Sequence, residues 1–333
     1  MRAISCAAPG ELALIDIDRP VLKPGWVRVG ISHIGICGTD YHIFEGKHPF
    51  LQYPRIMGHE LSGVVRDANG ATTLADGDAV VINPYLPCYN CPACREGKTN
   101  CCETLTVIGV HGDGGMAEEI VMPEANLYRA EGLSLRDAAM VEFLAIGAHA
   151  VRRTELRPSA RVLVVGGGPI GLGVAFFTRI AGADVTILDA AEDKLDAAHR
   201  FGFAIAALHQ LEGAEFKAGM GSGFDAVFDA TGSIAAMNQA IAYCRNGGAL
   251  TLVGVVKGML NWEDPEIHRR ELTIRASRNA TRADFDHVME SIRNGAVPTD
   301  QLATHSTSFD DVPANLPRWA KERNGLIKAI ITI

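Results

Sequence analysis

Hydrophobic and polar positions follow one period in the first third of the chain and a different one in the middle. In the first third, apolar and polar residues alternate over short runs that Gly and Pro interrupt. This pattern predicts half-buried strands at 27–31, 34–36, 61–65 and 78–82, with a turn at Asn69-Gly70. We therefore expect an all-β region here, with its loops free to carry functional side chains.

In the middle of the chain, continuous apolar runs alternate with helix-like stretches. Residues 161–165 predict a strand that is buried on both faces, and 172–181 predict the helix that follows it. The alternation continues with strands at 184–189, 224–229, 249–253 and 271–276 and a helix at 234–244. This rhythm is typical of a doubly wound parallel sheet, so the fold class is predicted to be α/β.

The last part of the chain is too short to form a domain. It predicts one helix at 284–294 and one strand at 327–333, and we expect it to return to the N-terminal region. A chain of 333 residues is also too long for one ordinary core. The predicted domains are therefore 1–149 together with 277–333, and 150–276.

Composition narrows the classes of function. The 31 Lys and Arg against 39 Asp and Glu give a net charge of −8, and no basic run occurs, which argues against nucleic-acid and membrane partners. The N-terminus lacks the apolar run of a signal peptide, so a cytoplasmic protein is expected. In a reducing compartment, the eight cysteines are more often metal ligands, catalytic or inert than disulfide-bonded.

Four cysteines lie on one short segment: Cys88, Cys91, Cys94 and Cys102 follow the spacing C-x2-C-x2-C-x7-C. Four thiolates suit a closed tetrahedral zinc site, which is structural because no coordination position is left for a substrate. An iron–sulfur cluster and a disulfide pair are the alternatives. Cys101 adjoins Cys102, and the spacing does not distinguish the two.

A second group of possible ligands lies between residues 37 and 60. Cys37, His59 and Glu60 offer the three ligand types of an open catalytic zinc site. Taken alone, they fit equally well a buried thiol, a loop histidine and a solvated glutamate. Glu142 lies in an apolar helical run that begins near a capping box at Ser134, and its periodicity favours an exposed position.

The buried strand at 161–165 leads into a glycine-rich loop, Gly-Gly-Gly-Pro-Ile-Gly, that opens a helix. Asp189 ends the next strand, about 20 residues on, where a dinucleotide fold places the acid that binds the ribose 2′-hydroxyl. Ala190 and Ala191 follow it, with no arginine to offset a 2′-phosphate, so NAD is favoured over NADP. The expected cofactor-binding residues are Gly166, Gly168, Pro169, Ile170, Gly171, Asp189, Thr231 and Val253.

Together these motifs resemble the zinc-dependent medium-chain dehydrogenases, in their polyol and sugar-acid branch. The resemblance spans essentially the whole chain. It rests on Cys37-Gly38-Thr39-Asp40-x-His42, Gly58-His59-Glu60, the four-cysteine segment, Gly114-Gly115-Met116-Ala117-Glu118, Glu142, the glycine loop, Asp189 and Ala230-Thr231-Gly232. It implies a GroES-like catalytic domain and a Rossmann NAD-binding domain, in a homodimer or homotetramer. One departure is Phe143, where the branch usually has proline after the glutamate.

The resemblance also implies roles for individual residues. Two zinc ions per chain are expected, a catalytic one on Cys37, His59 and Glu60 and a structural one whose fourth ligand is Cys102 rather than Cys101. Glu142 is expected to contact the catalytic metal or its water. Thr39 is expected to take the alcohol proton and pass it through the nicotinamide ribose to His42.

Segments 99–103, 107–115 and 277–280 are similar to bacterial hexonate dehydrogenases, which oxidise the 5-hydroxyl of L-galactonate or L-gulonate to a keto acid. The expected contacts to the substrate carboxylate are Arg278, His111 and Asn279, in that order. A neutral polyol dehydrogenase acting on galactitol or sorbitol and a threonine-dehydrogenase-like enzyme are the alternatives. A non-catalytic dinucleotide-binding protein is more distant, since such a protein needs neither the zinc ligands nor the relay.

Overall fold

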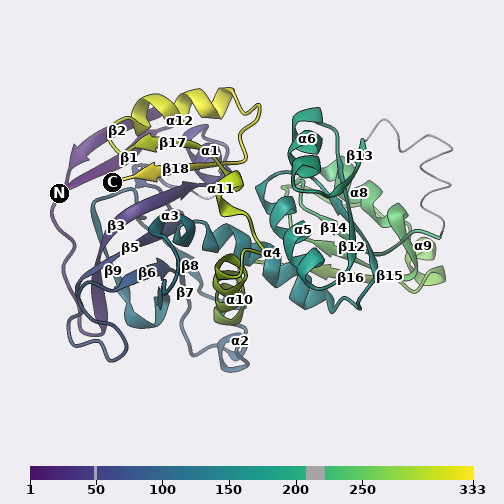
Figure 1. The fold of residues 1–333 in the computed structure, drawn as a ribbon, viewed down its shortest axis with the longest axis horizontal. Helices are drawn as coiled ribbons and strands as arrows, with labels where there is room; N and C mark the ends of the chain where they lie inside the picture. Colours follow the sequence, from purple (N-terminus) through teal and green to yellow (C-terminus); the bar gives the residue numbers. More distant parts are fainter. Residues whose placement is uncertain (49–50, 208–221) are drawn as a thin grey trace. The chain divides into compact units, whose positions relative to one another are not determined.

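The computed structural model describes residues 1–48, 51–207 and 222–333. The chain forms two compact units (Figure 1), the first of Met1–Glu142 with Val288–Ile333 and the second of Phe143–His287. The boundaries fall within two helices, α4 (Val141–Thr154) and α10 (Arg282–Arg293). Both ends of the chain therefore belong to the first unit.

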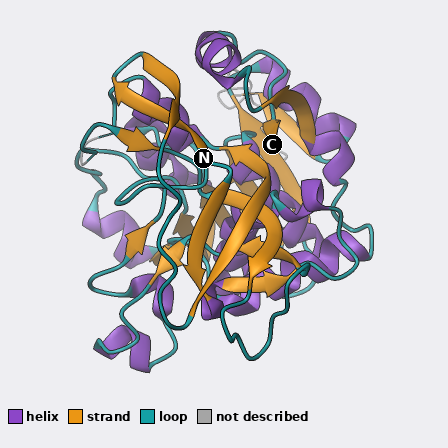
Figure 2. Cartoon of the chain, turned by 90° about the vertical axis from the view of Figure 1, so that its left-hand side faces the viewer, coloured by secondary structure: helices purple, strands orange, loops and turns teal. Residues whose placement is uncertain are grey.

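The first unit is built on a seven-stranded sheet in the order β10-β6-β5-β3-β18-β17, with β9 also pairing with β3. Figure 2 shows its strands in orange, strongly twisted. The strands are β3 (Trp26–Ile36), β5 (Glu60–Asp67), β6 (Ala79–Ile82), β9 (Glu119–Pro123), β10 (Leu127–Arg129), β17 (Ala303–Ser308) and β18 (Lys328–Thr332). The central strand β3 thus places residues from both ends of the chain side by side.

Smaller elements complete the first unit. A three-stranded sheet has the order β2-β1-β4, and β7 pairs with β8. Helix α12 packs against β2 and β17. The bounds are β1 (Arg2–Ala8), β2 (Glu11–Asp16), β4 (Arg55–Ile56), β7 (Tyr85–Leu86), β8 (Thr106–Val107), α1 (Gly38–Phe44), α2 (Pro92–Arg95), α3 (Leu135–Ala138), α11 (Thr299–Leu302) and α12 (Val312–Lys321).

The two strands predicted at 27–31 and 34–36 form the single strand β3. Its pairing with β5 shifts register between Ile31 and His33, where Ser32 and His33 interrupt the apolar alternation. A bulge of this kind bends a strand without ending it. The apolar side chains of β3 on either side of the bulge remain in the buried core of the unit.

The second unit contains a six-stranded sheet in the order β13-β12-β11-β14-β15-β16, in which all neighbours are parallel. The first strand of this sheet, β11, lies in the middle, and the later strands are added on either side of it. A crevice is therefore expected at the carboxyl ends of β11 and β14. The predicted doubly wound parallel sheet is confirmed. The elements are β11 (Arg161–Val165), β12 (Asp184–Asp189), β13 (Ala204–Ala207), β14 (Phe224–Asp229), β15 (Cys244–Leu252), β16 (Thr273–Ala276), α5 (Pro169–Ile180), α6 (Glu192–Arg200), α8 (Ile234–Ala240) and α9 (Asp264–Arg269).

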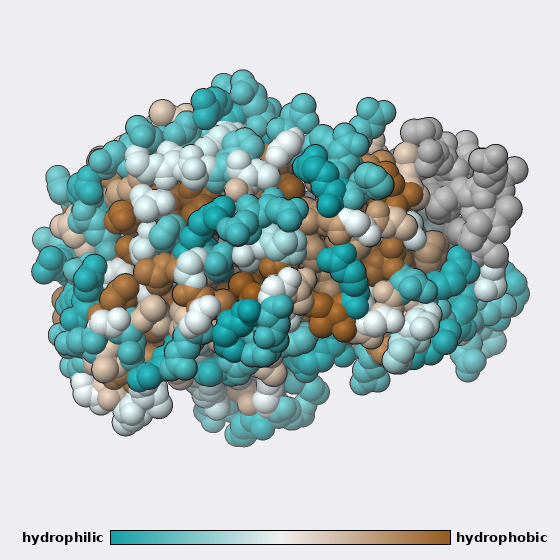
Figure 3. Space-filling model, viewed as in Figure 1, coloured by the Kyte–Doolittle hydropathy of each residue, from teal (hydrophilic) through white to brown (hydrophobic). Residues whose placement is uncertain are grey.

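Polar side chains, drawn in teal, cover much of the face of each unit that Figure 3 presents, with apolar ones scattered between them. Among the residues that the structure describes, no helix combines the length and the apolar character required to cross a bilayer.

Candidate active site

The structure brings Cys37, His59 and Glu60 together in the first unit. Cys37 follows β3 and is the N-cap of α1, and Glu60 is the first residue of β5. One ligand atom from each of the three lies within 4.8 Å of the others. Zinc bonds of about 2.0–2.3 Å in a tetrahedral site place neighbouring ligand atoms about 3.3–3.8 Å apart. The thiol, imidazole and carboxylate are therefore suitable in kind, and close enough together, to be candidate ligands of one zinc ion.

Asp40 holds the two ends of this ligand group together, a role that the sequence analysis missed. Its carboxylate accepts hydrogen bonds from the backbone N–H groups of Cys37 at 2.8 Å and Gly58 at 3.3 Å. It also lies 3.8 Å from His59 Nδ1. Burial raises the pKa of Asp40, although the neighbouring His59 opposes the shift. The sequence signalled only the bond from Cys37, through an acid three residues after the N-cap, the capping-box position.

Glu142 is 2% exposed, so the exposed position favoured by its periodicity is wrong. The predicted helix is divided into α3, which Ser134 caps, and α4, which begins at Val141. Glu142 therefore lies in a first helical turn, where helical periodicity over the longer run does not apply. Tyr85 donates its hydroxyl proton to Glu142 Oε1, while Oε2 is buried and without a hydrogen-bond partner among the described residues.

The electrostatics of Glu142 are those of a buried acid. Burial, with the nearby charge of Glu60, raises the pKa of Glu142 to about 7, although His59 and the hydrogen bond from Tyr85 oppose the shift. Its unpaired oxygen marks a place where a metal ion or a water molecule would satisfy the carboxylate. This position is compatible with the expectation that the Glu142 carboxylate contacts a metal at Cys37, His59 and Glu60, or the water bound to it.

Thr39 and His42 lie on α1, directly after Cys37. The Cys37 thiol donates to Thr39 Oγ1 at 3.8 Å. His42 follows Thr39 by three residues, so the two side chains share one helical face, and His42 is exposed. Partial burial and the positive charge of Arg323 lower the pKa of His42. The helix thus leads from the ligand group toward solvent.

The four cysteines of the 88–102 segment form a second cluster, in which their sulfur atoms lie within 4.8 Å of one another. Backbone N–H groups of Asn90 and Cys91 donate to the sulfur of Cys88 and lower its pKa to about 6. Cys102 belongs to this cluster, whereas Cys101 is exposed and outside it. No disulfide links any of the eight cysteines, all of which lie in the described part of the chain.

The glycine loop of the second unit joins β11 to α5. Gly166 has φ +100°, and a Cβ on Gly171 would lie 1.7 Å from the carbonyl oxygen of Gly166. Gly168 is the N-cap of α5, and Pro169 occupies its first turn. Glycine is therefore required for the turn and for the close helix–strand approach. The N-terminus of α5 is left available to a phosphate.

The remaining predicted cofactor residues lie at the same carboxyl edge of the sheet. Asp189 ends β12 and accepts hydrogen bonds from the N–H groups of Gly167 at 2.6 Å and Ala191 at 2.8 Å. Thr231 follows β14 and donates its hydroxyl proton to Asp229. Val253 follows β15, and its N–H donates to the Asp229 carbonyl. This edge is where open parallel sheets bind ligands.

The three candidates for carboxylate recognition are divided between the units. Arg278 and Asn279 follow β16 in the second unit; Arg278 is exposed, and Asn279 has φ +51°. The side-chain nitrogen of Asn279 is buried and has no hydrogen-bond partner in the described part of the chain. His111 is exposed in the first unit, and its Nδ1 accepts the N–H of Val107 at 3.0 Å.

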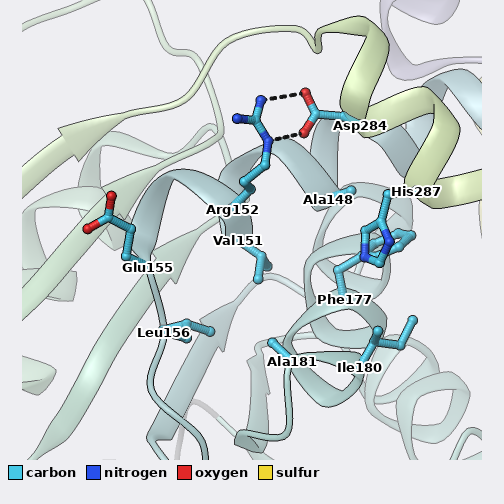
Figure 4. Close-up of a pocket in the computed structure, with 10 residues that line it drawn as sticks. All are labelled: Ala148, Val151, Arg152, Glu155, Leu156, Phe177, Ile180, Ala181, Asp284 and His287. Carbon is cyan, nitrogen blue, oxygen red and sulfur yellow. Dashed lines mark hydrogen bonds and ion pairs between the residues drawn. The ribbon is translucent and has the colours of Figure 1, made fainter.

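A pocket of about 360 Å³ lies between α4, α5 and α10 in the second unit (Figure 4). Its lining is mainly apolar, and Arg152 binds both carboxylate oxygens of Asp284 beside it. No predicted metal, cofactor or substrate residue lines this pocket. It is therefore separate from the side chains described above.

Comparison with known proteins agrees with this geometry. Residues 23–132 match the alcohol dehydrogenase GroES-like domain, and residues 169–294 match the zinc-binding dehydrogenase family. L-galactonate-5-dehydrogenase of Escherichia coli (strain K12) is 38% identical over 338 residues, covering 100% of this chain and 99% of that protein. The predicted GroES-like and Rossmann architecture is thereby confirmed.

Two solved structures share the whole fold. An alcohol dehydrogenase from Escherichia coli CFT073, in complex with NADH, superposes with a TM-score of 0.94 at 28% identity. A zinc-binding dehydrogenase from Sinorhizobium meliloti 1021, bound to NADP, superposes with a TM-score of 0.90 at 26% identity. Each alignment covers 100% of this chain and 99% of the other. The chain therefore belongs to the zinc-dependent medium-chain dehydrogenases and is an oxidoreductase of the alcohol dehydrogenase type.

Proposed function

We propose that this enzyme oxidises a secondary hydroxyl of a sugar acid, passing the hydride to NAD and yielding a keto acid. The favoured substrates are hexonates such as L-galactonate or L-gulonate, oxidised at C5. The observation that carries the proposal is the full-length similarity to L-galactonate-5-dehydrogenase. The buried carboxylate-containing ligand group of the first unit supports the same class of chemistry.

The proposed catalytic zinc ligands are Cys37, His59 and Glu60. Zinc bound there supplies a Lewis acid that lowers the pKa of the substrate hydroxyl. Glu142 adds a fourth polar group, with one buried oxygen free to accept a hydrogen bond. The four-cysteine cluster is proposed to hold a second zinc, structural because thiolates would occupy all its positions.

The proton of the substrate hydroxyl is proposed to leave by way of α1. Thr39 accepts it at its hydroxyl oxygen, beside the Cys37 sulfur, and passes its own hydroxyl proton onward. His42, which is exposed on the same face of the helix, exchanges it with solvent. The lowered pKa of His42 favours its neutral form, which can accept a proton near neutral pH.

NAD is the proposed cofactor and, when bound, supplies the hydride acceptor. The glycine loop and the N-terminus of α5 hold the pyrophosphate. Each Asp189 oxygen already accepts one N–H, and its second lone pair can accept a ribose hydroxyl. A 2′-phosphate at the same place would meet this negative charge with only Ala190 and Ala191 after it, which disfavours NADP.

The substrate carboxylate is proposed to meet Arg278, His111 and Asn279. A guanidinium matches a carboxylate in charge and geometry, and the unpaired Asn279 nitrogen offers a further donor. Groups of this kind favour the acid over the neutral polyol, because only the acid brings a negative charge that the guanidinium can pair with. We also propose that the enzyme acts as a homodimer or homotetramer.

The decisive experiment is a steady-state comparison of L-galactonate, L-gulonate, galactitol, sorbitol and L-threonine, each with NAD and with NADP. We expect a hexonate to have a kcat/KM at least about tenfold above either hexitol, a difference of about 1.4 kcal/mol, and NAD to be preferred. Equal or faster oxidation of a hexitol would assign the enzyme to the neutral polyol dehydrogenases. Turnover of none of these alcohols would contradict the proposal.

A further inference from the structure

A lysine lies fully buried beside the proposed metal ligands. Lys328, the first residue of β18, is 1% exposed. Its Nζ donates to both carboxylate oxygens of Glu60, each at 2.7 Å, and to the carbonyl oxygen of Ile36 at 3.2 Å. An ammonium group has three donors, and here three protein oxygens accept them. This cation is therefore held by the protein alone, without contact with solvent.

The strand register explains how residues 268 positions apart meet. Strand β18 pairs antiparallel with β3, with Ala329 opposite Ile36. Strand β3 pairs antiparallel with β5, with Gly35 opposite Glu60. Three adjacent strands therefore deliver the cation, the segment that leads into Cys37, and the carboxylate to one place.

Gly35 leaves the space in which the Glu60 carboxylate lies. A Cβ on Gly35 would fall 2.2 Å from Glu60 Oε2 and 3.3 Å from the backbone oxygen of Ala139. Two nonbonded heavy atoms cannot lie 2.2 Å apart, so a side chain at position 35 would displace the Glu60 carboxylate, and the Ala139 backbone limits how far the added Cβ could move away. Glu60 is thus confined on one side by the sheet backbone and bound by Lys328.

The buried acidic side chains around this site are stabilised by a cation buried beside them. Asp40, Glu60 and Glu142 are all at most 2% exposed, and Cys37 adds an ionisable thiol. Each of these acids that is ionised needs a compensating positive charge, because an uncompensated buried charge is strongly unfavourable. A bound divalent metal would supply two positive charges, and Lys328 supplies one whether or not the metal is present.

We propose that Lys328, in the space left by Gly35, is a positioning residue that assembles the metal site before the metal binds. It holds the Glu60 carboxylate in place and offsets the buried negative charge of the empty ligand group. The inference rests on the proposed function, in which Cys37, His59 and Glu60 hold the catalytic zinc. Lys328 and the metal would then both contact the Glu60 carboxylate, so each can partly compensate its negative charge when the other is absent.

If both contact Glu60, removing the lysine should destabilise the metal-free protein more than the metal-loaded protein. Without Lys328, the metal-free site retains buried carboxylates with less compensating charge, whereas zinc still compensates them in the loaded site. A lysine that served only to fill space would stabilise both forms equally. The difference between the two forms therefore separates electrostatic positioning from packing.

The test is thermal unfolding of the full-length chain carrying Lys328→Met, with Lys328→Arg and Lys328→Gln beside it. Each protein is measured with two zinc ions per chain and after mild chelation to one, with the zinc content determined by metal analysis. We expect Lys328→Met to lower the unfolding temperature of the one-zinc form at least twice as much as that of the two-zinc form. Folding that occurs only with two zinc ions is the extreme case of the same result.

The other two variants distinguish the effect of the positive charge of Lys328 from the effect of its hydrogen bonds. Lys328→Arg keeps the charge and is expected to reduce the difference, while Lys328→Gln keeps a donor without the charge and is expected to retain it. Lys321→Met, an exposed lysine on α12, is the matched control and is expected to change neither form. Gly35→Ala is expected to weaken binding of the zinc at Cys37, His59 and Glu60 at least tenfold by displacing Glu60.

Equal losses of unfolding temperature in the two forms of Lys328→Met, or a larger loss in the two-zinc form, would overturn this inference and leave the proposed function intact. Failure of both Lys328→Met and Lys328→Gln to fold even with zinc would overturn it as well, because metal would then not replace the lysine. A wild-type chain that never holds more than one zinc would instead overturn the proposed function and this inference together.

Discussion

The two metal-ligand clusters of the first unit are built in opposite ways. The four-cysteine cluster comes from one segment of 15 residues, 88–102, and its first member, Cys88, is exposed. The other cluster joins Cys37, His59 and Glu60 with buried groups from distant strands, including Lys328. One cluster offers four thiols to a metal ion, whereas the other offers three candidate ligands and is surrounded by buried ionisable groups.

This difference explains why the two clusters suit different tasks. Zinc bound by all four thiolates would leave no position for a substrate, so the local cluster is suited to stabilising the fold. Three ligands leave a position open, and the buried carboxylates beside them can act on whatever occupies it. Substitution of a candidate ligand should therefore reduce mainly activity at the open cluster and mainly stability at the four-cysteine cluster.

The largest effect is expected at the open cluster. Cys37→Ser removes the thiolate ligand, and kcat/KM should fall by about a thousandfold, or about 4 kcal/mol. Metal analysis should find one zinc per chain, retained by the four cysteines. Full activity together with two zinc ions would show that Cys37 is not a ligand.

The closed cluster should show the reverse pattern. Cys91→Ser removes one of the four thiolates, so one zinc should again be lost, and the unfolding temperature should fall by about 5–10 °C, at about 2–4 °C per kcal/mol. At a temperature where the variant is folded, kcat/KM should stay within about threefold of the wild-type value. A loss of activity as large as that of Cys37→Ser would show that the cluster acts on catalysis.

The smallest effect is expected just outside the closed cluster. Cys101 is exposed and adjoins the ligand Cys102, so Cys101→Ser should change the free energy of unfolding by less than about 0.5 kcal/mol. Two zinc ions should remain bound. Loss of one zinc would show that Cys101, and not Cys102, completes the cluster.

Features encoded by neighbouring residues could be predicted from the sequence. The four-cysteine spacing, the strand at 161–165 and the glycine loop after it all reach their final geometry within a short segment. The strand period and the helix start depend on neighbouring residues, so they do not change with the packing of the rest of the chain. The family resemblance follows from these motifs together.

The burial and pairing of charged side chains were decided only by the tertiary structure. Periodicity favoured an exposed Glu142, yet it is buried against Tyr85 because α4 begins one residue before it. Asp40 and Lys328 carried no local sign that they would contact the loop before His59 and the Glu60 carboxylate.

The physical reason is that burial depends on which strands become neighbours. The pairing of β18 with β3 and of β3 with β5 joins residues near 330 to those near 35 and 60. The sequence by itself determined which side chains could bind a metal and a dinucleotide. The sheet decided which ionisable groups surround them, and therefore which cluster is suited to stability and which to reaction.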